Sequence, residues 1–77
     1  MRVKLDIPRW SMKFKLYCFD KGWKASDVAD MTGLSVATIS SYWTGKKKPR
    51  DKTCDLIRDK TGFDMSEAIY LSNRGEL

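Results

Sequence analysis

The stretch MTGLSVATISSYWTGKKKPR, residues 31–50, contains two glycines that divide it into short helix-like segments and end it in a block of positive charge. Gly33 follows the first segment, and glycine adopts the left-handed conformation that ends many helices. Ser35 suits the start of a helix, because its hydroxyl accepts a hydrogen bond from a backbone N–H of the first turn. Gly45 closes the second segment in the same way. The spacing therefore predicts a helix-turn-helix over residues 24–43.

Apolar residues at helical spacing continue on both sides of this motif. They predict an all-α fold, a compact five-helix domain that spans residues 1–77 and has a short extended N-terminal arm. The arm is residues 1–7, where apolar and charged residues alternate with the period of a strand. A capping-box pattern at residues 64–67 opens the last helix. The predicted helices cover about 8–21, 24–32, 36–43, 51–60 and 65–73.

The first predicted helix carries two apolar stripes, whereas one stripe is enough to join a core. The second stripe needs a cover, and three covers are open: the N-terminal arm, the last helix, or a partner molecule. The first stripe consists of Trp10, Phe14 and Tyr17, and the second of Met12, Leu16 and Phe19. In the other helices we expect inward-facing Val28, Ala29 and Met31, then Ile39 and Tyr42, then Cys54 and Ile57, and finally Ile69 with either Ala68 or Leu71.

The charge of the chain is uneven along its length. The net charge is +5, but residues 1–52 carry 12 Lys and Arg against 5 Asp and Glu, and residues 53–77 carry 3 against 5. A basic front and an acidic tail indicate a polyanion on one side of the fold. A surface that only keeps the protein dissolved is the alternative.

Cys18 and Cys54 are the only cysteines, and there is no histidine. Without a signal peptide we expect two buried free thiols in a reducing compartment, rather than a disulfide. No run is long and apolar enough to cross a membrane, so we expect a cytoplasmic protein of a prokaryotic cell or a phage-infected host. The missing histidine removes the commonest metal ligand and general base. We therefore expect no metal, no cofactor and no enzymatic activity.

The segment GWKASDVADMTGLSVATISSYWTGKKKP, residues 22–49, resembles the DNA-binding domain of the Cro and C1 phage repressors, the XRE-type helix-turn-helix family. That family has a small residue in the first motif helix, a glycine four positions later, an aliphatic residue six beyond it, and a Gly-Lys-x-x-Pro exit. The resemblance covers about residues 14–63 and implies a lambda-repressor-like fold. The matching residues are Ala29, Gly33, Ile39, Gly45, Lys46 and Pro49, with Leu34 and Tyr42 at further core positions.

Two positions depart from the family pattern. Ala25 stands where the family often has a glutamine that contacts DNA, and we expect Lys24 or Ser26 to supply a contact to the DNA backbone instead. Trp43 stands where the family often has glutamate. We expect this indole to pack over the helix at 51–60, or to lie against DNA or a partner.

The resemblance implies that the recognition helix, residues 36–43, enters the major groove of double-stranded DNA. Its reading positions hold no Arg, Asn or Gln, the types that read a base with paired hydrogen bonds, so we expect modest discrimination in each half-site. The expected base-reading residues are Ser35, Val36, Ala37, Thr38, Ser40 and Ser41. The expected phosphate-contacting residues are Lys24, Ser26, Thr44, Lys46, Lys47, Lys48 and Arg50.

These features predict a sequence-specific DNA-binding regulator, most simply a small repressor of the phage or mobile-element type. Such domains usually bind as two-fold pairs, so we expect a homodimer, with the C-terminal region slightly favoured as its contact. The alternative is a protein-interaction module on the same fold that binds a repressor or a toxin. The surplus stripe Met12, Leu16 and Phe19 favours that alternative, as does the weak reading face.

Overall fold

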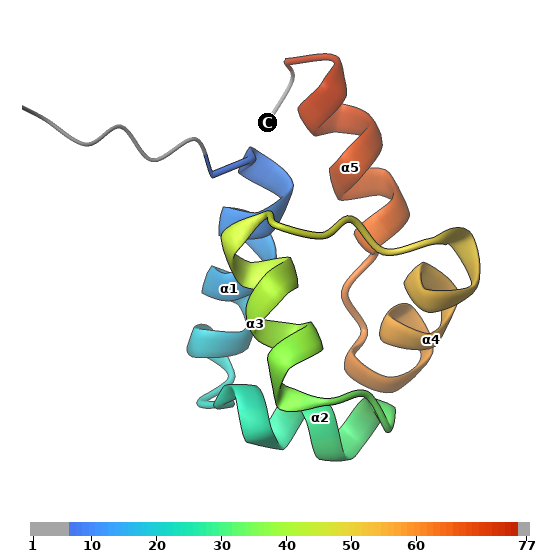
Figure 1. Cartoon of the computed structure of the whole chain (residues 1–77). Helices are drawn as coiled ribbons and strands as arrows, with labels where there is room; N and C mark the ends of the chain where they lie inside the picture. The colour runs from blue at the N-terminus through green and yellow to red at the C-terminus, as the bar shows by residue number, and fades with distance from the viewer. Residues whose placement is uncertain (1–6, 76–77) are drawn as a thin grey trace, which may run out of the picture.

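The computed structural model describes residues 7–75, in which short turns join successive helices (Figure 1). Every helix boundary lies within one residue of the sequence prediction, and none of the described residues lies in a strand. The predicted arm falls outside the described residues except for Ile7, which is half-buried and not helical. The helices are α1 (Arg9–Asp20), α2 (Ala25–Thr32), α3 (Val36–Thr44), α4 (Asp51–Thr61) and α5 (Met65–Asn73).

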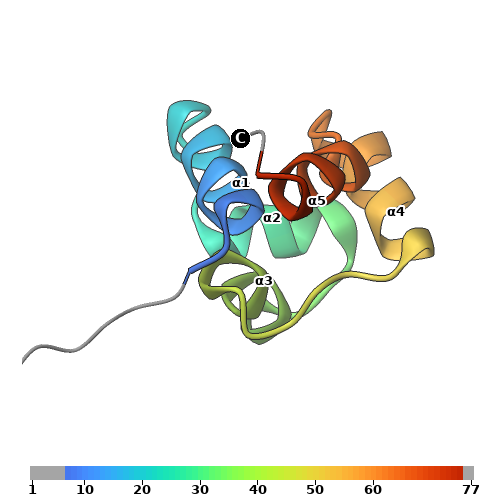
Figure 2. The same cartoon turned by 90° about the horizontal axis from the view of Figure 1, so that it is seen from above.

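The helices pack in a closed ring around a shared core. α1 packs on α5 and α3, α2 packs on α3 and α4, and α4 packs on α5 (Figures 1 and 2). Each helix therefore has two neighbours, so one apolar face of each is covered. Within residues 7–75, no helix has the length and apolar content that crossing a membrane requires.

Each of the five helices contributes at least one fully buried side chain to the core. Most inward positions were predicted correctly, Ala68 among them. Met65 was not predicted, yet it is completely buried at the first position of α5, three residues before Ala68 and on the same face of the helix. Met31 and Ile69 were expected inside and are only half-buried. The fully buried core side chains include Phe14, Val28, Ile39, Ile57 and Met65.

Helices α2 and α4 both end with a threonine that is followed by a glycine, and the threonine makes the same hydrogen bonds in each. The hydroxyl of Thr32 donates to the carbonyl of Val28 (2.8 Å) and accepts from the amide of Leu34 (3.3 Å). Thr61 repeats this arrangement at the end of α4, with the carbonyl of Ile57 at 2.7 Å and a following amide at 3.2 Å. Both threonines are buried, so the side chain satisfies backbone groups that water does not reach.

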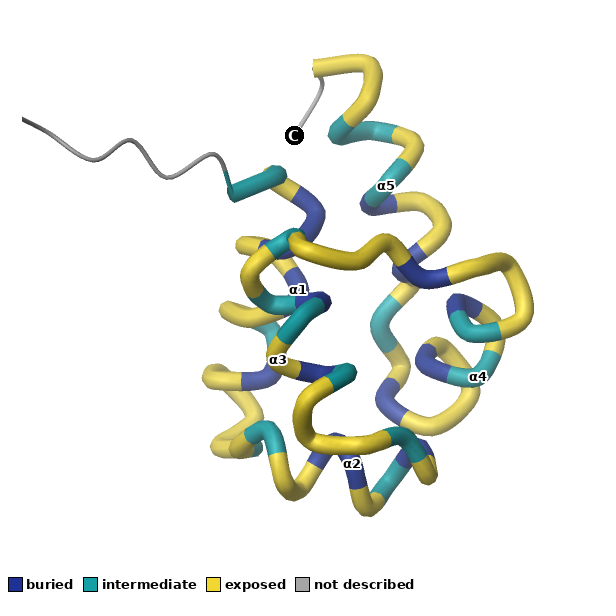
Figure 3. Tube along the Cα trace, in the orientation of Figure 1, coloured by how far each residue is buried: buried dark blue, intermediate teal, exposed yellow. Residues whose placement is uncertain are grey.

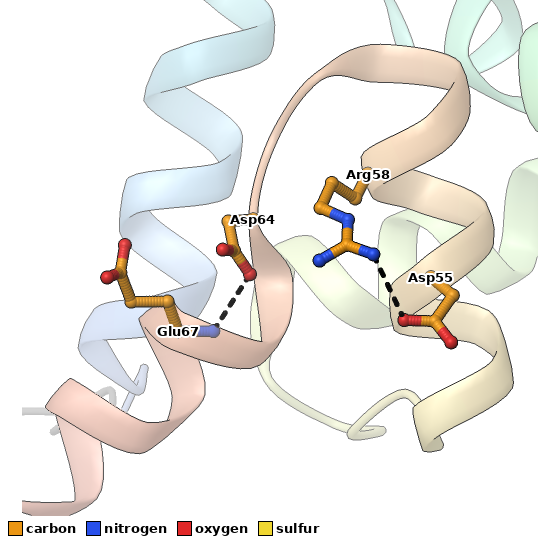
Figure 4. Close-up of polar contacts among 4 residues, drawn as sticks. All are labelled: Asp55, Arg58, Asp64 and Glu67. Carbon is orange, nitrogen blue, oxygen red and sulfur yellow. Dashed lines mark hydrogen bonds and ion pairs between the residues drawn. The ribbon is translucent and has the colours of Figure 1, made fainter.

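The helix starts are capped where the sequence predicted caps. Ser35 Oγ accepts from the amide of Thr38 (3.1 Å), and Asp64 Oδ1 accepts from the amide of Glu67 (3.1 Å; Figure 4). Pro8 was predicted inside the first turn of α1, but it is the N-cap residue, with an extended ψ of 150°. The carbonyl of Pro8 still accepts hydrogen bonds from the amides of Ser11 and Met12, so Pro8 caps the first turn of α1 without being a helical residue itself.

Trp43 does not pack over α4 as the sequence led us to expect. It lies on the side of α3 that faces α1, where its ring meets Phe19 edge-on at 5.5 Å and Phe14 at 6.5 Å. The reason is the ring of helices, in which α3 has α1 and α2 as its main neighbours rather than α4. The indole Nε1 is buried and has no hydrogen-bond partner of good geometry.

Both cysteines are free and buried, as expected. Burial raises the pKa of the Cys18 thiol to about 11, and a weak interaction with the indole of Trp43 opposes that rise. Burial also raises the pKa of Cys54. These thiols are therefore protonated and unreactive near neutral pH.

Candidate nucleic-acid interface

Helix α3 and the segment that follows it, residues 45–50, lie together along one face of the molecule. Seen from above, this face forms one edge, and α1 and α5 lie behind it (Figure 2). The segment runs from the end of α3 to the start of α4, and α4 then runs away from the face (Figure 2). The basic block therefore begins directly at the C-terminal end of α3 and runs from there across to α4 (Figure 1).

One side of α3 faces solvent and the opposite side enters the core. Ile39 and Tyr42 are buried, so residues on the other side of the helix are free to meet a ligand. Thr38 shares the inner side and is half-buried, which makes it a poor base-reading residue. The outward side carries Val36, Ala37, Ser40 and Thr44, all exposed, and Ser41, which is half-buried.

Two of the predicted base-reading hydroxyls are already used inside the helix. Ser35 Oγ caps α3 through the amide of Thr38 and is also hydrogen-bonded to the Thr38 hydroxyl at 2.8 Å. Thr44, predicted to contact phosphate, donates its hydroxyl to the carbonyl of Ser41 at 3.3 Å. Ser40 is exposed and carries no such internal bond among those found, so its hydroxyl is the freest on this face.

The segment 45–50 is held at both ends. The amides of Lys46 and Lys47 both donate to the carbonyl of Ser41, at 3.0 and 3.4 Å, so the chain turns tightly off α3. Pro49 is buried and interrupts the exposed stretch, which is visible in Figure 3. The backbone of this cationic segment is therefore anchored, and its Lys and Arg side chains extend from it into solvent.

A polar hollow of ≈ 340 Å³ lies where this segment meets α4. Lys47, Lys48 and Arg50 line it, so three of the predicted phosphate-contacting cations converge there. Lys46 is exposed but does not line the hollow. Tyr42 and Thr53 complete the lining. An anion in this hollow would meet positive charge near the N-terminal end of α4, where helix dipoles also favour anions.

Sequence reasoning missed the two hydroxyls of this hollow. Tyr42 was predicted in the core and is buried there, but it also lines the hollow. Burial raises the pKa of its phenol, and a hydrogen bond with Thr53 opposes that rise. Thr53 is the third residue of α4. Its position close to the Lys-rich segment 45–50 is the feature of the sequence that could have predicted its place in the hollow.

The start of α2 is a weaker candidate for phosphate contact. Lys24 and Ser26 are exposed there, as a contact to the DNA backbone requires. However, Asp27 Oδ2 accepts from the amide of Lys24 at 2.8 Å, so a carboxylate already occupies this helix end. A phosphate that approached this end would meet a negative charge as well as Lys24.

No group of three or more His, Cys, Asp or Glu side chains in residues 7–75 is arranged to hold a metal ion. The hollows on the described surface are open and shallow, which fits the docking of a large ligand rather than the enclosure of a small one.

Comparisons with known proteins agree with this geometry. A family model described as helix-turn-helix matches residues 18–67, which is more than half of the chain and includes α2, α3, α4 and the basic segment. Searches of curated proteins and of solved structures returned no significant match. The family is one of DNA-binding regulators and not of enzymes. The chain belongs to the Cro/C1-type helix-turn-helix family.

Proposed function

We propose that the protein binds double-stranded DNA sequence-specifically, with α3 in the major groove, and acts as a small repressor of the phage or mobile-element type in a prokaryotic cell. The observation that carries the proposal is the shared face of α3 and the hollow lined by Lys47, Lys48 and Arg50. An exposed helix followed by cations on an anchored backbone suits a groove bordered by phosphates.

Residue type indicates which side chains of this face contact bases and which contact phosphates. Val36 and Ala37 offer methyl groups for thymine, and the Ser40 hydroxyl offers one hydrogen bond to a base edge. Lys47, Lys48 and the other exposed cations of segment 45–50 supply affinity that does not depend on sequence. Discrimination in each half-site is therefore modest, and DNA shape and the pairing of two half-sites add the rest.

The proposal is tested by removing two charges at the face and two elsewhere. Lys47→Ala with Lys48→Ala takes two cations from the hollow, and each lost phosphate contact is expected to lower the slope of log affinity against log salt by about 1. The matched control is Arg58→Ala with Lys60→Ala, which removes the same charge from the far end of α4. Figure 4 shows Arg58 of this pair, with its neighbour Asp55. Arg58 and Lys60 lie 3.7 and 3.9 Å from neighbouring carboxylates, and both are exposed.

The expected result is a slope lower by about 2 for the hollow variant and an unchanged slope for the control. Equal losses in the two variants would mean that the protein acts only as a diffuse positive charge. The proposed contact face would then be wrong.

We also propose that two copies bind together, with half-sites about 34 Å apart on the DNA. The C-terminal helix α5 is the favoured contact, because the resemblance to the family implies it, and Tyr70 offers an exposed ring there. Tyr70→Ser should weaken binding to a duplex with two half-sites and leave binding to one half-site unchanged. If both affinities stay the same, another surface forms the pair.

A second candidate function is a protein-interaction module that binds a repressor or a toxin. The apolar stripe of α1 favours it, since Met12, Leu16 and Phe19 all remain exposed among the described residues. A complex of this kind would be indifferent to the loss of Lys47 and Lys48, whereas DNA binding would be weakened by it.

A further inference from the structure

The exposed side of α1 is an apolar surface that the described fold leaves uncovered. Met12, Leu16 and Phe19 expose 49%, 63% and 55% of their surface. Their spacing of four and three residues places them on one face of the helix. Three large apolar side chains together on a small protein mark an interaction site more often than chance exposure does.

This surface is an open groove along α1. Two adjoining hollows of ≈ 460 and ≈ 400 Å³ share Ile7, Met12 and Leu16 in their lining, and the second extends to Phe19 and Trp43. The Trp43 ring meets Phe19 edge-on at 5.5 Å, which holds the Phe19 ring in place. The groove therefore runs from the start of α1 to its last turn, and α3 forms part of one wall.

The rim of the groove is positively charged. Arg9, Lys13 and Lys15 line the two hollows, and none of the described lining residues is acidic. Lys15 Nζ lies 5.6 Å from the centre of the Phe19 ring, so one cation sits directly at the apolar floor. This charge decides between occupants. In a two-fold contact between copies the same patch meets itself, so the cations of both rims would converge.

We propose that the α1 groove binds an amphipathic helix of a protein partner, one whose apolar stripe is flanked by Glu or Asp. Apolar anchors one turn apart fit the row formed by Met12, Leu16 and Phe19. Acidic flanks complement Lys13 and Lys15. Trp43 packs toward α1, whereas the proposed DNA-reading residues face solvent on another side of α3, so the groove and the DNA face are separate surfaces. The protein can thus hold DNA and this partner together.

The probe is a pair of designed helical peptides with the same leucine stripe, one flanked by Glu and the other by Lys. Binding to the full chain is measured by calorimetry at physiological salt. We expect the Glu-flanked peptide to bind at least tenfold tighter. Leu16→Ser should weaken its binding at least tenfold, and the control Lys60→Ser, which alters an exposed side chain in the last turn of α4, should not. Lys13→Glu with Lys15→Glu should reverse the preference between the two peptides.

Three results would overturn the inference. The first is binding of neither peptide, or equal binding of both. The second is self-association of the protein that Leu16→Ser abolishes, which would assign the groove to a second copy. The third is tighter peptide binding after Val3→Ser with Leu5→Ser, which would mean that the N-terminal residues of the same chain compete for it. DNA affinity, measured on the same variants, should stay unchanged for Leu16→Ser, so the outcome is independent of the proposed DNA binding.

Discussion

Gly45 is the residue at which the end of α3 meets the start of α1. Its φ is +82°, and a Cβ built on it would overlap Cδ of Pro8 and lie 2.8 Å from Cγ of the same ring. Gly33 has nearly the same φ, +77°, but a Cβ there would meet no atom within 4 Å. Comparing alanine substitutions at these two glycines therefore separates the free-energy cost of the left-handed backbone from the cost of the contact with Pro8.

We predict that Gly33→Ala lowers the free energy of unfolding by about 1–2 kcal/mol, the cost of left-handed backbone for a residue with a Cβ. Gly45→Ala bears the same cost and also forces Pro8 away from α3, and overpacking of this kind adds about 1–3 kcal/mol. Urea unfolding followed by circular dichroism measures both values. Pro8→Ala removes the Cγ and Cδ that overlap, so it should recover most of the additional loss in the Gly45→Ala background.

Equal losses for Gly33→Ala and Gly45→Ala would refute this reasoning, because the contact between Pro8 and the end of α3 would then contribute nothing. A loss in Gly45→Ala that Pro8→Ala leaves unchanged would have the same meaning.

Three further predictions concern the core. Ile39→Ala, at a fully buried position, should lower the free energy of unfolding by about 2–5 kcal/mol, whereas Leu16→Ala on the exposed stripe should change it by less than about 0.5 kcal/mol; urea titrations compare them. Ser11→Ala should stabilise the fold by about 1 kcal/mol, because the buried Ser11 Oγ has no hydrogen-bond partner, and a loss of stability would mean that a bond exists. The pKa of Cys18 is raised from 9.0 to about 11, so the stability that its neutral thiol contributes is complete below pH 9 and is lost as the pH rises through 11. Cys18→Ala should therefore flatten the decline of the melting temperature over this pH range. An unchanged decline would exclude Cys18 as its cause.

Local signals in the sequence were sufficient for the helices and their ends. Glycines, N-cap residues and apolar periodicity act within a few residues of one another, so the boundaries of α2 and α3 could be read directly. The family pattern then placed Ile39 in the core, where it is completely buried.

Features that depend on which helices touch could not be predicted in the same way. Trp43 was expected over α4, or against DNA or a partner. It packs on α1, because periodicity gives the inner side of a helix but does not identify its neighbour. The hydroxyls of Tyr42 and Thr53 meet in the hollow only after α3 and α4 are joined by the anchored segment between them. The exposure of Met12, Leu16 and Phe19 was likewise open until the ring of helices showed that no described segment covers them.

The most direct test of the central claim is binding of the purified protein to labelled duplexes tiled from the DNA that flanks its own gene, measured by fluorescence anisotropy at low and near-physiological salt. Our account predicts that one tile binds far better than the rest, that this preference survives added salt, and that Ser40→Ala reduces it. If every tile binds alike and all binding disappears as salt is added, the positive face binds DNA without regard to sequence and α3 does not read bases.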